Sequence, residues 1–417
     1  MNKFEIKGSR QLNGEIKIQG AKNSILPILA ATLLCEDECI INNCPHISDV
    51  DTAVEILLHL GCDVNFKNNV LRVNTKNLTK YDIPENLMRK MRSSIIFLGA
   101  LIARTGFAKA TLPGGCEIGP RPINLHVDGF KQLGIAVTES GGVIECEIQK
   151  INRSFSITLP FPSVGATENL MLASLACDGT TVLHNVAREP EIIDLAEFLN
   201  KIGAQIFGAG ESDIIISGNK KFHGTYHTVI PDRIVAITYM CAAAVTNGHL
   251  ILHDISSKYI NSSISVFEES GCFIKEYNNK IEIVSPEKLQ SVKSIRTMAY
   301  PGFPTDAQAP VMSSLLLANG TSVFVETIFK SRYKHVGELL RLGADIKVEG
   351  HVAIVEGVSK LSGANVTASD LRGGAALIIA AIAAEGTSII SNIKYVQRGY
   401  ENITEILNDV GGCAKII

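Results

Sequence analysis

A six-fold internal repeat constrains the fold of this 417-residue chain more than any other feature. A glycine that closes an amphipathic run, and that precedes a small or apolar residue, recurs at Gly61, Gly134, Gly203, Gly271, Gly343 and Gly411. The intervals between these glycines are 73, 69, 68, 72 and 68 residues. Self-similarity at a nearly fixed period indicates one structural unit of about 70 residues that is used six times.

Each unit shows the same order of local signals. An extended segment precedes an apolar helix, and a β-branched strand such as Thr321–Val325 follows. An amphipathic helix such as Ile192–Ile202 comes next, and one or two short strands finish the unit. A second glycine separates the apolar helix from the strand, and we expect it to end the helix as a C-cap. The instances are Gly106, Gly179, Gly248, Gly320 and Gly386.

The apolar helices decide the architecture. Helices that are apolar on every face must lie in an interior. The clearest runs are Leu170–Ala176, Ile237–Val245, Val311–Leu317 and Ala375–Ala384. Solenoid repeats are usually shorter, at about 20–45 residues, so a solenoid does not fit. We predict compact α/β domains with helices inside and sheets outside, and six units divide most simply into two domains of three.

The composition excludes several classes of protein. A net charge of −3 and the absence of Trp argue against a nucleic-acid or membrane-surface binder. The N-terminal segment alternates like a strand and lacks the apolar core of a signal peptide. The longest apolar runs, 26–34 and 375–384, are about half the length that spans a bilayer. We expect a cytoplasmic protein.

The cysteines do not suggest a metal site. Ten are scattered along the chain without a C-x2-C pair. Cys35, Cys39 and Cys44, followed by His46, are the best metal candidates. The first two fall in a helix end and the next strand, whose core faces would hide them. With no Walker-type loop and no evident acidic cluster, we expect no metal and no cofactor.

Cations stand at the beginnings of several apolar helices, where the helix dipole disfavours them. They are Lys22, Arg92, Arg233 and Arg372. Asp306 and Asp370 occupy equivalent places, and either could be a helix cap. Capping does not explain the cations, whereas a bound anion would. The sequence therefore favours a site for a small, highly charged anion. Further cations in polar loops are Arg121, Arg332 and Arg398.

A loop with unusual contents covers residues 110–126. Three glycines and three prolines within 113–126 exclude a helix or a central strand. The loop places Cys116 five residues before Arg121. A thiol near fixed positive charge has a lowered pKa and can act as an acid, base or nucleophile. The alternative is a tight turn that happens to include a cysteine.

Several motifs resemble one known family. The chain is similar over essentially its whole length to the UDP-N-acetylglucosamine 1-carboxyvinyltransferases, enolpyruvyl transferases related to EPSP synthase. The motifs that carry the resemblance are Gly20-Ala21-Lys22-Asn23, Lys90-Met91-Arg92-Ser93-Ser94, the loop from Pro113 to His126, Ser163-Val164-Gly165-Ala166-Thr167, Tyr300 to Asp306, and Arg398-Gly399-Tyr400-Glu401.

The resemblance implies a specific form of the α/β fold. We expect a two-domain inside-out α/β barrel built from six βαβαββ repeats, three per domain, with the active site in the cleft between the domains. The expected domains are residues 22–230, with the Cys116 loop, and residues 1–21 together with 231–417. The N-terminal strand is thereby implied to cross to the C-terminal domain.

The implied reaction moves the enolpyruvyl group of phosphoenolpyruvate to the 3′-hydroxyl of UDP-N-acetylglucosamine and releases phosphate. This is the first committed step of peptidoglycan synthesis. Cys116 resembles the general acid that protonates the methylene carbon. Asp306 resembles the base for the sugar hydroxyl, with Asp370 as its nearest competitor. Such a protein needs two small-molecule substrates and neither nucleic acid nor membrane.

The resemblance also assigns binding roles. Lys22, Arg121 and Arg398 would hold phosphate and carboxylate groups, and fixed positive charge stabilises an anionic tetrahedral intermediate. Arg92, Arg332 and Arg372 would add to that field. The residues that match sugar-nucleotide contacts are Asn23, Pro122, Ile123, Asn124, Leu125, Ser163, Val164, Gly165, Asp306 and Ile328. The loop should act as a lid.

The chain departs from the family pattern at a few places. Gln397 replaces a common Asp, Tyr395 a common His, and Phe161 a Lys that contacts uridine. Lys330 and Ser331 replace Glu-Asn. These changes leave open a divergent paralogue that senses the sugar nucleotide. A second alternative is a 3-phosphoshikimate 1-carboxyvinyltransferase, although the cysteine loop and the Ala-Lys-Asn-Ser start do not match that enzyme.

Overall fold

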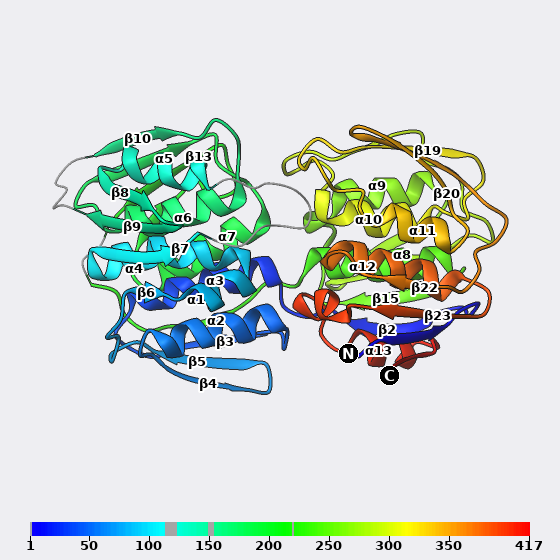
Figure 1. The fold of residues 1–417 in the computed structure, drawn as a ribbon, viewed down its shortest axis with the longest axis horizontal. Coiled ribbons are helices and arrows are strands. Elements are labelled where there is room, and N and C mark those ends of the chain that lie inside the picture. The colour runs from blue at the N-terminus through cyan, green and yellow to red at the C-terminus, as the bar shows by residue number, and fades with distance from the viewer. Residues whose placement is uncertain (1, 113–122, 149–153, 219–220) are drawn as a thin grey trace. The chain divides into compact units, whose positions relative to one another are not determined.

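The computed structural model describes residues 2–112, 123–148, 154–218 and 221–417. The chain forms two compact units, which Figure 1 shows with the chain coloured from blue to red. We call residues 20–230 the N-unit, and residues 2–19 with 231–417 the C-unit. Cys116, Arg121 and Pro122 lie outside the described residues. Among the described residues, no helix has both the length and the apolar character needed to cross a membrane.

Each unit contains three four-stranded sheets of one design. The first strand runs parallel to the second, and the second, third and fourth strands pair antiparallel. In the N-unit, in spatial order, the sheets are β14 (Tyr226–Thr228), β3 (Cys39–Asn42), β5 (Val70–Asn74) and β4 (Asp63–Lys67); β6 (Asp82–Ile83), β7 (Phe107–Thr111), β9 (Val143–Ile148) and β8 (Ile135–Ser140); and β10 (Phe155–Thr158), β11 (Thr180–His184), β13 (Asp213–Ser217) and β12 (Gln205–Phe207).

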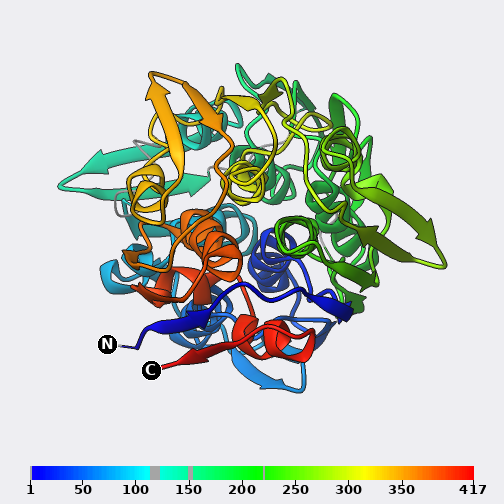
Figure 2. The ribbon, with the colours of Figure 1, turned by 90° about the vertical axis from the view of Figure 1, so that its right-hand side faces the viewer.

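The C-unit repeats this design with strands from both ends of the chain. Its sheets are β2 (Asn13–Lys17), β15 (His249–His253), β17 (Lys280–Val284) and β16 (Phe273–Tyr277); β18 (Ile295–Arg296), β19 (Thr321–Val325), β21 (Val352–Glu356) and β20 (Asp345–Glu349); and β22 (Asn365–Thr367), β23 (Thr387–Ser391), β1 (Phe4–Lys7) and β24 (Ala414–Ile416). Figure 2 shows β1, in blue, beside the red C-terminal strand. Six sheets of one topology confirm the six-fold repeat and the α/β fold class.

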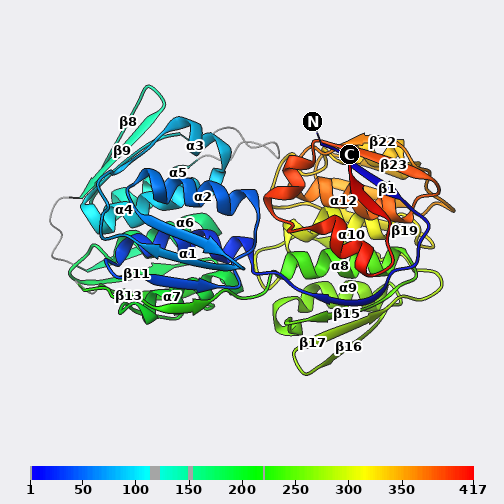
Figure 3. The ribbon, with the colours of Figure 1, turned by 90° about the horizontal axis from the view of Figure 1, so that it is seen from below.

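Three helices form the interior of each unit. In the N-unit they are α1 (Lys22–Ala31), α4 (Phe97–Thr105) and α6 (Val164–Ser174). In the C-unit they are α8 (Arg233–Val245), α10 (Thr305–Ser314) and α12 (Leu371–Ala383), which lie together in Figure 3. Every residue of α8 is buried, as a helix that is apolar on all faces requires. The predicted helix ending at Leu317 is three residues too long, because α10 ends at Ser314.

Each repeat also has one amphipathic helix, and the first half of the chain has the additional short helix α3 (Glu85–Lys90). The amphipathic helices are α2 (Ser48–His59), α5 (Asn124–Gln132) and α7 (Pro190–Lys201) in the N-unit, and α9 (Asn261–Glu269), α11 (Val336–Arg341) and α13 (Ile403–Asp409) in the C-unit. A glycine that ends each repeat follows every one of them, and all six glycines adopt positive φ angles between 78° and 108°. Side chains other than glycine rarely adopt this conformation, which explains why glycine marks the period.

The second glycine series has a mixed role. Gly106 is the left-handed C-cap of α4, as predicted. The prediction is wrong for Gly248, which has no positive φ, because Asn247 takes the left-handed position there with φ 53°. Gly248 is needed for close packing instead, since an added Cβ would lie 2.4 Å from the carbonyl oxygen of Leu12.

Candidate active site

Asp306 is the centre of a charged cluster in the C-unit. It lies in the first turn of α10, and its Oδ1 accepts a hydrogen bond of 3.0 Å from Nη2 of Arg332. Its Oδ2 accepts one of 3.2 Å from Nη2 of Arg372, the second residue of α12. Both arginine side chains are only 3% exposed, whereas the carboxylate is 28% exposed. Two buried cations therefore hold one accessible carboxylate.

Arg372 is itself held by Tyr400. Its Nη1 donates to the Tyr400 hydroxyl at 3.2 Å, and that hydroxyl also lies 2.9 Å from Oγ1 of Thr238 on α8. Burial alone lowers the pKa of Arg372, but Tyr400 and Asp306 outweigh burial and raise this pKa above its ordinary value. The guanidinium is therefore permanently charged in the interior of the C-unit.

The segment after β19 is fixed by a buried carboxylate. Glu326 Oε1 accepts hydrogen bonds from the backbone N–H groups of Ile328 and Phe329, at 2.8 and 3.0 Å. Its Oε2 accepts from the Thr305 hydroxyl at 2.9 Å, beside Asp306. Arg332 also donates to the Thr305 carbonyl oxygen, at 2.9 Å from Nη2. Ile328, predicted to contact the sugar nucleotide, is thus tied to the turn that carries Asp306.

The two aspartates that sequence could not separate have different roles. Asp370 caps α12, because its Oδ1 accepts from the backbone N–H groups of Arg372 and Gly373 at 3.1 and 3.0 Å. Asp306 is not at the N-cap position of its helix, which Pro304 occupies. Asp370 is therefore a helix cap close to the arginines, while the Asp306 carboxylate faces the side chains of two of them.

Arg398 lies in the C-unit at the end of the 3₁₀ helix η4 (Ile393–Arg398) and is half-buried. The segment that follows is held by Gln19, whose Nε2 donates to the Gly399 carbonyl oxygen at 3.2 Å and whose Oε1 accepts from the Glu401 N–H at 2.9 Å. The N-terminal ribbon of the chain thus anchors the backbone next to Arg398.

Lys22 begins α1 in the N-unit and is 8% exposed. Its Nζ lies 2.6 Å from Oδ2 of Asp49, which belongs to the first turn of α2 and is 2% exposed. This carboxylate offsets the cost of placing a cation at a helix N-terminus. The neighbouring Asn23 is half-buried.

The other predicted residues of the N-unit occupy helix starts. Arg92 begins the 3₁₀ helix η2 (Arg92–Ile96) and is half-buried. Ser163 caps α6, with its Oγ 3.4 Å from the N–H of Ala166, and Val164 and Gly165 open that helix. Ile123 is buried before α5, Asn124 is exposed and Leu125 is half-buried.

The positions that depart from the family pattern lie toward solvent. Phe161 is 42% exposed, and Lys330 and Gln397 are exposed as well. Ser331 and Tyr395 are half-buried. None of these five side chains forms one of the hydrogen bonds between Asp306, Arg332 and Arg372 described above.

Comparison with known proteins decides the family. A family model described as EPSP synthase (3-phosphoshikimate 1-carboxyvinyltransferase) matches residues 6–407. The chain belongs to the EPSP synthase family. The resemblance that the motifs indicated is confirmed.

Two relatives in this family match the chain almost end to end. The UDP-N-acetylglucosamine 1-carboxyvinyltransferase 2 of Caldanaerobacter subterraneus subsp. tengcongensis is 51% identical over 411 residues, which cover 99% of this chain and 98% of that protein. The UDP-N-acetylglucosamine 1-carboxyvinyltransferase of Halothermothrix orenii is 46% identical over 411 residues, with the same coverage.

Solved structures show the same fold at low identity. The enolpyruvyl transferase NikO from Streptomyces tendae has a TM-score of 0.90 at 22% identity and covers 100% of this chain and 98% of that one. An EPSP synthase from Acinetobacter baumannii has a TM-score of 0.76 at 15% identity and covers 100% of both chains. At these identities the likeness concerns the fold alone.

Sequence reasoning missed several side chains that position the predicted residues of this family member. They are Asp49, Gln19, Glu326 and Tyr400. Glu326 lies near its partner Ile328 in sequence, whereas each of the other three is far in sequence from the residue that it contacts. Tyr400 stands in a motif that carried the resemblance. The other three follow ordinary strand or helix patterns, so no local signal distinguished them.

Proposed function

We propose that this chain transfers the enolpyruvyl group of phosphoenolpyruvate to the 3′-hydroxyl of UDP-N-acetylglucosamine and releases phosphate, in the cytoplasm. The observation that carries the proposal is the 44–51% identity, over 99–100% of the chain, to relatives named for this reaction. The family model has the name of the shikimate enzyme, but these full-length relatives do not. The product would enter peptidoglycan synthesis.

The reaction is an addition followed by an elimination. The sugar oxygen bonds to C2 of phosphoenolpyruvate while C3 gains a proton and the hydroxyl loses one. The resulting tetrahedral intermediate then loses a proton from C3 and inorganic phosphate from C2, which restores the alkene. Cys116 would supply the proton to C3 as a general acid, and this assignment lies outside the described residues.

Asp306 suits the task of receiving or orienting the hydroxyl proton. Two buried guanidinium groups fix the rotamer of its carboxylate, and its 28% exposure leaves it accessible to a ligand. An oriented acceptor contributes to rate because it needs no reorganisation in the transition state. Asp370 suits this task less well, because its Oδ1 is engaged in capping α12.

The anion-binding role falls to cations of both units. Lys22 and Arg92 belong to the N-unit, while Arg332, Arg372 and Arg398 belong to the C-unit. The proposal requires that Lys22 and Asp306 act on the same bound substrates. Mutant kinetics test this requirement directly, because residues that act as one catalytic unit are strongly non-additive. If Lys22→Gln combined with Asp306→Asn lowers kcat by the product of the single effects, the two residues do not act as one catalytic unit, which counts against the proposal.

An acceptor comparison tests the function. The assay measures phosphate released from phosphoenolpyruvate with either UDP-N-acetylglucosamine or shikimate 3-phosphate as acceptor. We expect release with the sugar nucleotide and none with the shikimate ester. Release with the shikimate ester alone would favour a 3-phosphoshikimate 1-carboxyvinyltransferase. Binding of the sugar nucleotide without turnover would favour a sensor.

A further inference from the structure

Three side chains on the solvent-facing side of the β10–β11–β13–β12 sheet are hydrogen-bonded in a line. Oγ of Ser156, on β10, lies 3.1 Å from Nε2 of His184, on β11. Nδ1 of the same ring lies 2.9 Å from Oδ1 of Asp213, on β13. All three residues are partly or largely exposed, and none belongs to the candidate active site. Their order, from hydroxyl to imidazole to carboxylate, is that of the nucleophile, base and orienting group of a serine hydrolase.

The carboxylate sets the tautomer of the imidazole. An ionised Asp213 can only accept hydrogen bonds, so the proton of the neutral His184 ring is on Nδ1. Nε2 is then unprotonated and accepts a hydrogen bond from the Ser156 hydroxyl. The ring is thus in the form that can take the hydroxyl proton. A serine Oγ is a weak nucleophile until an adjacent base takes this proton, so the arrangement activates Ser156.

A row of apolar side chains crosses the same face of the sheet, beginning beside the serine. Strand register places Ser156 next to Val182, which is partly exposed. Ile215 on β13 and Phe207 on β12 continue the row, and they are 43% and 62% exposed. Residues in register on neighbouring strands share one face of a sheet. An apolar acyl chain that covers this row would therefore have its carbonyl carbon at Ser156.

The backbone of β10 supplies a donor for the carbonyl oxygen of a bound ester. Among the described strands, β10 is at the edge of its sheet and has β11 as its neighbour. The Leu159 N–H donates to the His184 carbonyl oxygen, and alternate residues of a parallel strand bond to the same neighbour. The N–H of Ser156 therefore points away from β11, toward the edge of the sheet. An N–H at the nucleophile itself can stabilise the negative oxygen of a tetrahedral intermediate.

We propose that Ser156, His184 and Asp213 form a second catalytic site, which hydrolyses esters of apolar carboxylic acids and does not depend on the transferase reaction. Oγ of Ser156 bonds to the acyl carbon while its proton passes to Nε2 of His184. The tetrahedral intermediate expels the alcohol, which takes that proton, and leaves an acylated serine. Water then attacks the acyl carbon and gives a proton to Nε2, and Oγ recovers this proton as the acid departs. One ester and one water thus become one acid and one alcohol.

Hydrolysis of p-nitrophenyl hexanoate by the full chain tests this site. The protein is first treated with N-ethylmaleimide, so that accessible thiols cannot attack the ester. We expect Ser156→Ala and Asp213→Asn each to lower the rate of nitrophenol release at least about tenfold. Ser140→Ala is the matched control, because Ser140 is an exposed serine at the end of β8, and it should keep the wild-type rate. A wild-type rate in Ser156→Ala would overturn the proposal.

The length of the acyl chain tests the role of the apolar row. Ile215 is two strands away from Ser156, roughly 10 Å, so a six-carbon acyl chain reaches its side chain and an acetyl group does not. Ile215→Thr keeps the β-branched shape and makes the position polar. We expect the ratio of the hexanoate rate to the acetate rate to fall at least about threefold in this variant. An unchanged ratio would overturn the choice of an apolar acyl group.

Labelling with a fluorophosphonate gives a readout that does not depend on turnover. Such a reagent phosphonylates an activated serine Oγ and releases fluoride. Mass spectrometry should find the label on Ser156 in the wild-type chain and not in His184→Gln. Urea unfolding confirms that the variant is folded, and its midpoint should be nearly unchanged because the ring is partly exposed. Absence of the label from wild-type Ser156, or equal labelling of the variant, would overturn the proposal.

Discussion

Asp306 and Arg372 are 66 residues apart in sequence, and their Oδ2 and Nη2 atoms lie 3.2 Å from each other. This contact joins the first turns of α10 and α12, two of the three interior helices of the C-unit. Corresponding positions of two repeats thus contribute a carboxylate and a cation to one cluster. Residues at the same position in different repeats are therefore brought into contact by the packing of their helices.

Replacing Asp306 by Asn keeps the shape of the side chain and removes its charge. We expect kcat to fall by about 10²–10⁴, the range for loss of a general base or acid. Phosphate release at saturating substrate measures the effect. The control is Asp345→Asn, at an exposed position of β20, which should leave kcat unchanged. Activity of Asp306→Asn within about tenfold of wild type would exclude a catalytic base at this position.

Tyr400→Phe removes one hydroxyl from between two buried partners. Arg372 and Thr238 each lose a hydrogen bond inside the C-unit. We expect the free energy of unfolding to fall by about 1–3 kcal/mol, the cost of leaving buried polar groups unsatisfied. Urea unfolding measures this loss. Tyr226→Phe is the matched control, because Tyr226 is 61% exposed, and it should be neutral.

Lys22 and Asp49 provide a comparison between a buried and an exposed ion pair. Asp49→Ala leaves a buried ammonium without its carboxylate at 2.6 Å, and we expect a loss of about 3 kcal/mol in unfolding free energy. Glu55→Ala breaks the Lys90–Glu55 pair, which has the same 2.6 Å distance but is about half exposed on both sides. That variant should lose less than about 1 kcal/mol. Equal losses would show that burial does not matter here.

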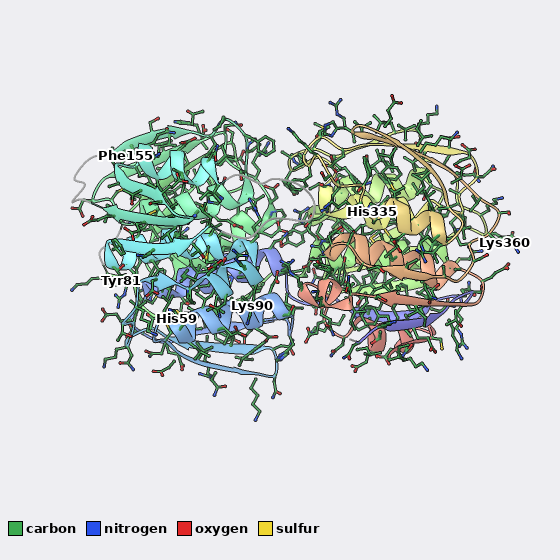
Figure 4. The ribbon with its side chains drawn as sticks, in the orientation of Figure 1. His59, Tyr81, Lys90, Phe155, His335 and Lys360 are labelled. Atoms are coloured by element: carbon green, nitrogen blue, oxygen red, sulfur yellow. The ribbon has the colours of Figure 1, made fainter. Side chains whose placement is uncertain are left out.

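The pH dependence of stability should reflect His335, which Figure 4 labels in the C-unit. Burial lowers its pKa to about 4; Asp370 opposes this effect, and Arg332 adds to it. Above about pH 6.5 the ring is neutral in both states and contributes nothing. As pH falls toward 4 the unfolded state binds a proton that the folded state refuses, so stability is lost, by about 2–3 kcal/mol.

The variant that tests this linkage is His335→Gln. Its unfolding free energy, measured by urea at about pH 7 and about pH 4.5, should fall less than that of the wild type, because one group with a depressed pKa has been removed. His126 also has a lowered pKa and keeps part of the slope in both proteins. A wild-type slope in His335→Gln would contradict the assignment.

Fosfomycin, an epoxide that alkylates the loop cysteine in this family, tests the role of Cys116. We expect mass spectrometry to find the label at Cys116, and faster labelling when UDP-N-acetylglucosamine is bound, as a closing lid requires. Cys413 gives an internal control, since it is the one cysteine of the described residues that is not buried. Labelling that is equal with and without the nucleotide would count against lid closure.

The sequence predicted what depends on local patterns. The glycine period revealed six units because each glycine has a left-handed backbone that few other residues adopt. Apolar runs revealed the inner helices, because a helix that is apolar on every face must be buried. The partners of Lys22 and Arg372 could not be predicted in this way. Asp49 appears as an ordinary acidic residue in a first helical turn, and its contact with Lys22 exists only after α1 and α2 pack.

Competition between equivalent residues also limited the prediction of the site. Asp306 and Asp370 begin equivalent helices, and the sequence allowed either to be a cap. Packing separates them, because Arg332 and Arg372 both reach the carboxylate of Asp306, while Asp370 turns back to its own helix. The roles of Cys116 and Arg121 stay predictions, since both lie outside the described residues.

The pairing of β1 with β23 and β24 orders events during synthesis. Phe4 leaves the ribosome long before its strand partner Ile416. The last strand of the N-unit is β14, which completes the sheet of β3, β5 and β4, so all strands of this unit exist once residue 228 has emerged. In the C-unit, β2 finds its partner β15 once residue 253 has emerged, but β1 finds β23 and β24 only after residues 387–391 and 414–416 have followed. A nascent chain stalled late in translation therefore carries one finished half and an open template for edge-to-edge association.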